Sequence, residues 1–212
     1  MNFNTYLFDF DGTLVDSMPT YVGVMMRILE ENNIAYPEDI VKIITPLGYK
    51  GTAEYFIKLG LNMSMDEIIA LMNSYASQEY QNNVPAKDNV ADTLIKLKER
   101  GADLNILTAS PHNMLDPCIK RLGISHLFTN VWSCEDFATT KADVNIYKMA
   151  AEKIGKPMEE ILFVDDNYNA VETASHSGIK TCGIYDKSSH EYTELIKSVA
   201  DFYVKDFSEL LY

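Results

Sequence analysis

The chain of 212 residues is poor in positive charge and has no long apolar run. Its 18 lysine and arginine residues are outnumbered by 31 aspartate and glutamate residues, so the formal net charge at pH 7 is −13. Such a surface repels phosphate backbones and anionic lipids, and we expect neither nucleic acid nor a membrane as a partner. No apolar stretch approaches the roughly 18 residues that a transmembrane helix needs. An anionic substrate would need a local cation to overcome the overall charge.

Cysteine and histidine patterns typical of metal or disulfide sites are also missing. The three cysteines, Cys118, Cys134 and Cys182, are odd in number and have no CxxC or zinc-type spacing. Because the sequence also opens without a charged-then-apolar leader, we expect buried thiols in a reducing cytoplasm. The histidines have no HExxH or paired spacing, and we interpret each as a surface or packing residue: His112, His126, His176 and His190.

The hydrophobic content of 47% is typical of a globular protein. Two parts of the chain differ in the secondary structure that their patterns predict. Residues 18–82 carry only helical patterns, including a capping-box pair at Ser64 and Glu67. From about residue 84 onward, helices that end at glycine alternate with short apolar strands, which is typical of parallel βαβ units. The opening strand has no partner without this second block. The sequence therefore predicts an α/β fold in which a doubly wound parallel-sheet, Rossmann-like core (residues 1–17 and 83–212) carries an inserted all-helical cap (residues 18–82).

The expected core elements follow this alternation along the chain. Strands are expected at residues 5–8, 104–107, 128–132, 161–164 and 181–184. Helices are expected at residues 88–100, 112–122 and 143–154, with a further helix that closes at Gly178. In open α/β sheets, ligands bind at the carboxyl ends of the strands, so these ends are where function is expected.

Two carboxylates follow the first strand directly, at Asp9 and Asp11. Gly12 comes next and permits backbone angles that a Cβ forbids, so both acids can face one crevice. Acids so close repel each other, which makes sense if a cation lies between them or if one stays protonated. The alternative for an isolated motif of this kind is a strand that ends in a polar turn.

Two other strand ends favour the functional interpretation. One strand ends at Thr108, Ala109 and Ser110, and another ends at Asp165 and Asp166. A cation, Lys141, precedes a helix of the same block, although a solvated surface lysine is the alternative for it. One edge of the sheet is thus expected to gather four acids, a hydroxyl and an ammonium.

This set of groups suits phosphoryl transfer. Hard oxygen ligands without cysteine or histidine point to Mg²⁺ rather than zinc. A hydroxyl, main-chain N–H groups near a helix start and a lysine complete a phosphate cradle. One aspartate can then act as the nucleophile while the other protonates the leaving oxygen.

Four segments in order resemble the successive motifs of the haloacid-dehalogenase-like (HAD) hydrolase superfamily. They are DFDGTLVDS (9–17), LTAS (107–110), TTKADVNIY (139–147) and LFVDDNYNAVETASHSGI (162–179). The resemblance covers nearly the whole chain and is strongest to the branch with a helical cap after the first motif, which includes phosphoglycolate-phosphatase-like and β-phosphoglucomutase-like enzymes. It implies a phosphoric monoester hydrolase that forms an aspartyl-phosphate.

The resemblance also implies a role for each site residue. Asp9 would be the nucleophile and Asp11 the general acid and base. Lys141 would offset the charge of Asp9 and the phosphoryl group. Thr108 and the main chain of Ala109 would hold the phosphoryl oxygens. Mg²⁺ would bind to Asp9, Asp11 (through its carbonyl), Asp166 and Asp165.

Several positions depart from the family pattern. The last motif is often GDxxxD, but here Asp165 takes the glycine position and Ala170 the later acid position; Ala142 follows Lys141 where proline is usual. Asp11 argues against dehalogenation, because the dehalogenases lack this second aspartate. Tyr21 stands where the phosphoglucomutase pattern carries a histidine near the first cap helix, which disfavours a mutase.

We therefore expect a Mg²⁺-dependent phosphatase of a small phosphorylated metabolite. The alternatives are a phosphosugar mutase on the same fold and a catalytically idle homologue that acts as a binding protein. A receiver domain, suggested by ILFVDD at 161–166, is excluded because too few residues follow the acid pair. Tyr21, Tyr49 and Lys50 are candidates for substrate contact, with Gly48 and Gly51 giving their turn freedom, although packing or a surface position is the more common role for residues of these types. Apolar cap helices could pack internally or against a second copy, so the oligomeric state stays open.

Overall fold

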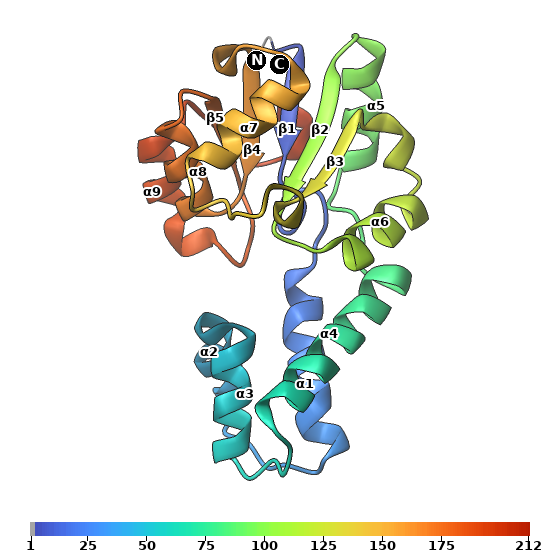
Figure 1. Ribbon diagram of the computed structural model, residues 1–212, viewed down its shortest axis with the longest axis vertical. Coiled ribbons are helices and arrows are strands. Elements are labelled where there is room, and N and C mark those ends of the chain that lie inside the picture. Colours follow the sequence, from blue (N-terminus) through green and yellow to red (C-terminus); the bar gives the residue numbers. More distant parts are fainter. Residues whose placement is uncertain (1–2) are drawn as a thin grey trace. The chain divides into compact units, whose positions relative to one another are not determined.

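The computed structural model describes residues 3–212, which form two compact units (Figure 1). One unit comprises Met1–Asp16 and Pro85–Tyr212, and the other comprises Ser17–Val84. The first is the α/β core and the second is entirely helical among its regular elements. Each unit has its own buried apolar side chains, so we describe each by itself.

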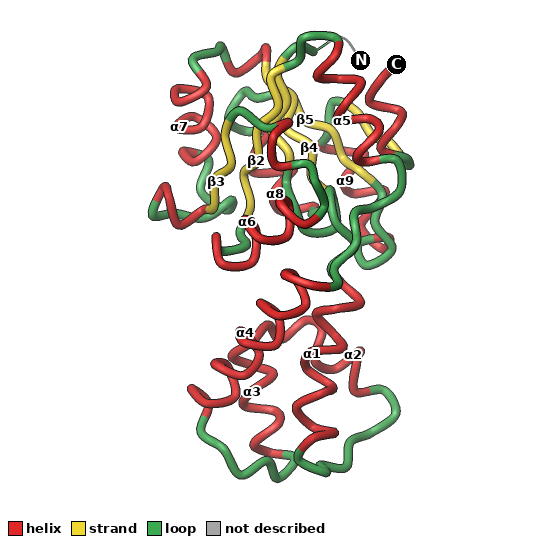
Figure 2. Tube along the Cα trace, turned by 90° about the vertical axis from the view of Figure 1, so that its right-hand side faces the viewer, coloured by secondary structure: helices red, strands yellow, loops and turns green. Residues whose placement is uncertain are grey.

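The core contains a six-stranded parallel sheet with the order β3-β2-β1-β4-β5-β6. Figure 2 shows these strands as one layer with helices to either side. The strands are β1 (Thr5–Phe8), β2 (Asp103–Thr108), β3 (Asn130–Ser133), β4 (Ile161–Asp165), β5 (Lys180–Ile184) and β6 (Phe202–Val204). The predicted doubly wound α/β fold is confirmed. The third strand begins about two residues later than the sequence indicated.

Helices cover both faces of this sheet. The α-helices of the core are α5 (Val90–Glu99), α6 (His112–Arg121), α7 (Asn145–Ile154), α8 (Tyr168–Ser175) and α9 (Thr193–Val199). Short 3₁₀ turns are η2 (Ser125–Leu127), η3 (Cys134–Phe137), η4 (Met158–Glu160), η5 (His190–Tyr192) and η6 (Phe207–Leu211).

Alternate residues of the central strands supply the two halves of the core. Leu7 and Phe163 lie on one face and pack with α7 and α8. Phe8 lies on the other face, with its ring 5.5 Å from that of Phe207 in η6. Because β1 is buried on both faces, its residues form a continuous apolar run rather than an alternating one. Each large side chain buried in this way contributes about 1.5–3 kcal/mol, so the middle of the sheet rigidly supports the loops at its strand ends.

The helical unit contains α1 (Met18–Glu31), α2 (Ile40–Ile44), η1 (Thr45–Leu47), α3 (Gly48–Lys58) and α4 (Met65–Asn82). The capping box predicted before α4 is confirmed, since the Ser64 hydroxyl accepts from the Glu67 N–H and Glu67 accepts from the Ser64 N–H. Ser17 occupies the N-cap of α1, but its side chain makes no capping hydrogen bond. No helix within residues 3–212 is long and apolar enough to cross a membrane.

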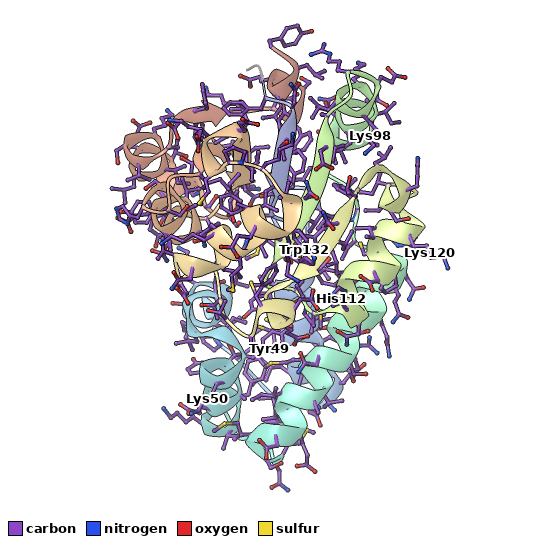
Figure 3. The ribbon with its side chains drawn as sticks, turned by 45° about the horizontal axis from the view of Figure 1, so that its top comes forward. Tyr49, Lys50, Lys98, His112, Lys120 and Trp132 are labelled. Carbon is purple, nitrogen blue, oxygen red and sulfur yellow. The ribbon has the colours of Figure 1, made fainter. Side chains whose placement is uncertain are left out.

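The turn expected around Gly48 and Gly51 is not a turn. Both glycines belong to α3, and only Gly48, its first residue, has a positive φ. Tyr49 and Lys50 therefore project from the first turn of a helix (Figure 3). The Tyr49 ring stacks on that of Tyr21, 5.5 Å between centroids and 9° from parallel. Packing within the helical unit is thus one role that these two tyrosines have.

Candidate active site

The carboxyl ends of β1 and β4 bring three acids together. Phe8 pairs with Val164 in the parallel register, so Asp9 and Asp165 follow at the same level of adjacent strands. Carboxylate oxygens of Asp9, Asp165 and Asp166 all lie within 4.8 Å of one another, and all three residues are buried. The close approach follows from the strand register rather than from sequence proximity.

Lys141 lies between two of these acids. Its ammonium donates hydrogen bonds to the Asp9 carboxylate and, at 2.8 Å, to the Asp165 carboxylate. The loop that carries the lysine is held from α7, because the buried Tyr147 hydroxyl lies 3.0 Å from the Lys141 carbonyl and 3.1 Å from that of Ala170. An ammonium buried with two carboxylates fixes both acids in one geometry.

Electrostatics leave this cluster short of positive charge. Burial raises the pKa of Asp9 to about 7, with the Lys141 ammonium opposing the shift and the neighbouring acids adding to it. Burial, followed by the charges of Asp165 and Asp9, also raises the pKa of Asp166 well above its usual range. Burial alone would lower the pKa of Lys141, but the charges of Asp165 and Asp9 raise it. One ammonium thus faces three acids.

A divalent cation fits this arrangement. The clustered donors are carboxylate oxygens, which are the hard ligands that Mg²⁺ prefers, and no cysteine or histidine belongs to the group within residues 3–212. A cation would also supply the missing positive charge. The donor set therefore suits magnesium, and a single lysine does not neutralise it.

The turn after β1 approaches the acids closely. Gly12 has a φ of +77°, and a Cβ built on it would lie 2.6 Å from Oδ1 of Asp166. Only glycine fits here, because any side chain would meet that carboxyl group and strain the backbone. The next residue, Thr13, lies with its hydroxyl 3.5 Å from the same Oδ1.

Asp11 lies beside the three-acid cluster and joins it to the end of a second strand. This half-buried carboxylate accepts a hydrogen bond from the Ser110 hydroxyl. The Ser110 N–H in turn donates to the hydroxyl of Thr108, at 3.0 Å. Thr108 is buried at the end of β2 and Ala109 is exposed beside it. The LTAS segment and Asp11 are therefore joined through Ser110.

The structure places the expected catalytic, phosphate-binding and metal-binding residues at this one edge of the sheet, in the α/β unit, whereas the candidates for substrate contact, Tyr21, Tyr49 and Lys50, belong to the helical unit. Asp9, Asp165, Asp166 and Lys141 meet directly, whereas Asp11 and Thr108 are linked through Ser110. Ala170, at the position of the family's later acid, is buried and donates its N–H to Asn167. The later acid of the usual motif therefore has no counterpart at position 170.

Two features of the site were absent from the sequence-based expectations. Asn167 caps α8, with its side chain accepting from the Ala170 N–H, and its place just before a helix was a usable signal. Lys87 and Asp186 form a largely buried ion pair at 2.9 Å beside the turn of Gly12. No local sequence pattern predicts this pair, because 99 positions separate its two residues.

A family model and known proteins match this chain along most of its length. A model of the haloacid dehalogenase-like hydrolase family matches residues 6–184. Pyrophosphatase PpaX of Oceanobacillus iheyensis is 25% identical over 213 residues, which cover 100% of this chain and 96% of that protein.

Solved structures share the fold. An inferred β-phosphoglucomutase from Thermotoga maritima has a TM-score of 0.85 at 20% identity, covering 98% of each chain. The inferred hydrolase YfnB from Bacillus subtilis, bound to magnesium, has a TM-score of 0.83 at 16% identity, covering 99% of this chain and 97% of that one. At these identities the likeness concerns the arrangement of elements.

Proposed function

Because the chain belongs to the haloacid dehalogenase-like hydrolase family, we propose that it is a magnesium-dependent phosphatase of a small phosphorylated metabolite. The observation that carries the proposal is the buried Lys141 ammonium shared by Asp9 and Asp165, with Asp166 in the same cluster. Such a cluster suits a reaction whose catalysis consists mostly of positioning and charge neutralisation. The pyrophosphatase name of a relative supports hydrolysis of a phosphoryl bond.

Asp9 is the proposed nucleophile. Its carboxylate attacks phosphorus and the bond to the leaving oxygen breaks, which gives an aspartyl-phosphate and the free alcohol. Asp11 donates the proton that the leaving oxygen needs. In the second step Asp11 takes a proton from water, whose oxygen attacks phosphorus and releases inorganic phosphate and the Asp9 carboxylate.

The end of β2 and Lys141 would bind the phosphoryl group. The Thr108 hydroxyl and the main-chain N–H of Ala109 would donate to its oxygens, while the ammonium offsets their charge. The hydrogen bond from Ser110 to Asp11 supports this arrangement, because it ties the acid–base group to the loop that holds the phosphoryl oxygens.

Magnesium is the proposed cofactor; Asp9, Asp166 and the Asp11 carbonyl would hold it, and Asp165 would be a further ligand, direct or through water. When bound, it supplies a Lewis acid that neutralises phosphoryl charge. Magnesium in the YfnB structure supports the choice of metal. The three buried acids support it from this chain itself.

Residues 18–82 are proposed to act as a cap that excludes bulk water and supplies specificity groups. The segments that lead to and from this unit pair with each other within the core: Val15 bridges Ala86, and the Asp16 N–H donates to the Pro85 carbonyl at 3.0 Å. Both crossings are therefore anchored at one place, which suits a hinge. The reducing cytoplasm expected from the sequence stays a prediction, supported by three buried thiols: Cys118, Cys134 and Cys182.

The test is turnover on a panel of phosphorylated compounds with and without Mg²⁺. The panel should contain p-nitrophenyl phosphate, inorganic pyrophosphate, phosphoglycolate, sugar phosphates and nucleotides. Magnesium-dependent release of phosphate, lost in Asp9→Asn, would support the proposal. A folded protein that releases phosphate from none of them would instead favour the idle homologue.

A phosphosugar mutase is the second candidate, supported by the fold shared with the Thermotoga maritima protein. Tyr21 in place of the mutase histidine disfavours it. The two activities separate in one measurement: a mutase interconverts sugar 1- and 6-phosphates without net phosphate release, whereas a phosphatase releases one phosphate per molecule.

A further inference from the structure

Lys87 lies outside the cluster of carboxylates and contacts two loops beside it. Its ammonium donates hydrogen bonds to the main-chain carbonyl of Gly12, to the carbonyl of Tyr185 at 2.8 Å and to the Asp186 carboxylate at 2.9 Å. An ammonium has three N–H bonds, so these contacts use all of its donors. The side chain is 17% exposed. Lys87 is therefore fixed in place rather than solvated.

Gly12 connects this lysine to Asp166. Its carbonyl accepts from Lys87, while its α-carbon lies so close to the Asp166 carboxyl group that no Cβ fits between them. A glycine has no side chain to hold its position. Main-chain hydrogen bonds hold it instead: its N–H donates to the Val15 carbonyl, and its carbonyl accepts from Lys87. The Leu14 and Val15 N–H groups close the same turn onto the Phe10 carbonyl, so Lys87 adds the side-chain contact to a turn that the main chain forms.

Asp186 gives Lys87 a rigid anchor. It is buried just after β5, and its carboxylate accepts from the Ser188 N–H at 2.8 Å as well as from Lys87. The pKa of Asp186 lies below its usual value because the hydrogen bonds from Ser188 and Lys87 outweigh burial, which acts in the opposite direction. Since β4 lies between β1 and β5, Lys87 links the loops on either side of the strand that carries Asp165.

We propose that Lys87, anchored by Asp186, is a positioning residue that holds the Gly12 turn at a fixed distance from Asp166. This rests on the proposed function, because the turn belongs to the loop that carries Asp9 and Asp11. Lys87 acts through Gly12 and does not touch substrate. As a consequence, we expect Asp9, Asp11 and Asp166 to keep the same relative positions throughout turnover.

A purely electrostatic role for Lys87 makes a different prediction. Lys87→Met removes a positive charge near the cluster, whereas Asp186→Asn removes a negative one. If charge alone matters, the two variants shift activity in opposite directions. If position matters, both loosen the same hydrogen-bonded link and both slow turnover.

The first measurement is the kinetics of p-nitrophenyl phosphate hydrolysis at saturating Mg²⁺, well below each variant's unfolding temperature. We expect kcat of Lys87→Met to fall about 10- to 100-fold with little change in KM, as for other residues that orient a metal site from behind. Asp186→Asn should fall in the same direction, and Lys87→Arg should recover part of the loss. Lys98→Met, on the exposed side of α5 (Figure 3), is the matched control and should match the parent. Opposite shifts in the two single variants, or a folded Lys87→Met with unchanged kcat, would overturn the proposal.

The second measurement does not need turnover. Amide hydrogen exchange of a peptide that covers residues 9–16 should become faster in Lys87→Met and stay unchanged in Lys98→Met. If the parent protein hydrolyses no phosphoester, the proposed function fails, while exchange still reports whether Lys87 holds this turn. Unchanged exchange in Lys87→Met overturns the proposal whatever the activity.

Discussion

Asp9 and Lys141 form a buried ion pair although 132 positions separate them in the sequence. Their side chains are only 7% and 13% exposed. Two charges taken out of water in this way must satisfy each other, because removal of one partner from a buried pair leaves the other uncompensated, at about 3–5 kcal/mol. The pair therefore constrains both folding and chemistry at this edge of the sheet.

Removal of the proposed nucleophile should separate these two effects. We expect Asp9→Asn to lower turnover at least about 1,000-fold, since the amide cannot form the acyl-phosphate. The amide keeps the shape and one acceptor for Lys141, so circular dichroism should remain that of the parent. Asp16→Asn, an exposed acid of the same segment, is the control and should keep full activity. Retained turnover in Asp9→Asn would refute the assignment.

Magnesium should stabilise the protein in the absence of substrate. A ligand that binds only the folded state adds about 2.7 kcal/mol at a concentration of 100 times its Kd. We expect the unfolding temperature to rise as Mg²⁺ is added. Asp166→Asn should need at least about tenfold more Mg²⁺ for the same rise. Asp92→Asn, an exposed acid on α5, should respond like the parent. Equal shifts in both variants would contradict a role of Asp166 in metal binding.

The close approach of Gly12 to Asp166 predicts contrasting effects of alanine at two glycines. Gly12→Ala combines a clash at 2.6 Å with a left-handed backbone, and we expect a loss of about 1–3 kcal/mol of stability together with reduced turnover. Gly23→Ala, in α1, meets no atom within 4 Å and should stabilise by about 0.5–1 kcal/mol. Urea denaturation measures both. The site geometry would be wrong if the Gly12 variant proved neutral.

His112 predicts a pH dependence of stability. It lies at the start of α6 (Figure 3), where its ring nitrogens contact Asp116 at 2.9 Å and Asp136 at 2.8 Å. Hydrogen bonds to Asp116 and then Asp136 raise its pKa above the usual 6.5. A raised folded-state pKa means that this stabilisation is fully present below about pH 6.5 and is lost as the pH rises through the folded value.

The check is the free energy of unfolding of the parent and of His112→Gln at pH 5.5 and pH 9. We expect the variant to be less stable at pH 5.5, by no more than about 1 kcal/mol because solvent screens a side chain that is 38% exposed, and the gap to close at pH 9. A stability difference between the parent and His112→Gln that grows as the pH rises would contradict this prediction.

The course of the chain through the core could be predicted from local patterns. Short apolar strands, glycines after helices and the Ser64–Glu67 capping box depend on interactions within a few residues, so each leaves a readable signal. The position of Asp9, Thr108 and Asp165 at strand ends follows from the same pattern. Parallel strands then bring these ends to one edge, because their register is shared.

Tertiary packing decided the cases in which local and long-range preferences compete. The glycines at 48 and 51 indicated a turn, but the segment is helical because Thr52, Ala53 and Phe56 are buried against the rest of its unit. A glycine in a helix costs about 1 kcal/mol relative to alanine, and the burial of one aromatic side chain stabilises the helix by more than that.

The sequence alone thus determined which chemical groups this protein has, and the strand ends at which they lie. Only the folded chain decided which of them contact one another: Lys141 forms ion pairs with Asp9 and Asp165, Lys87 forms one with Asp186, and the Ser110 hydroxyl donates a hydrogen bond to Asp11. The physical reason is that an ion pair between distant residues leaves no periodic or local trace. Its partners are selected by sheet register and by the cost of leaving a buried charge alone.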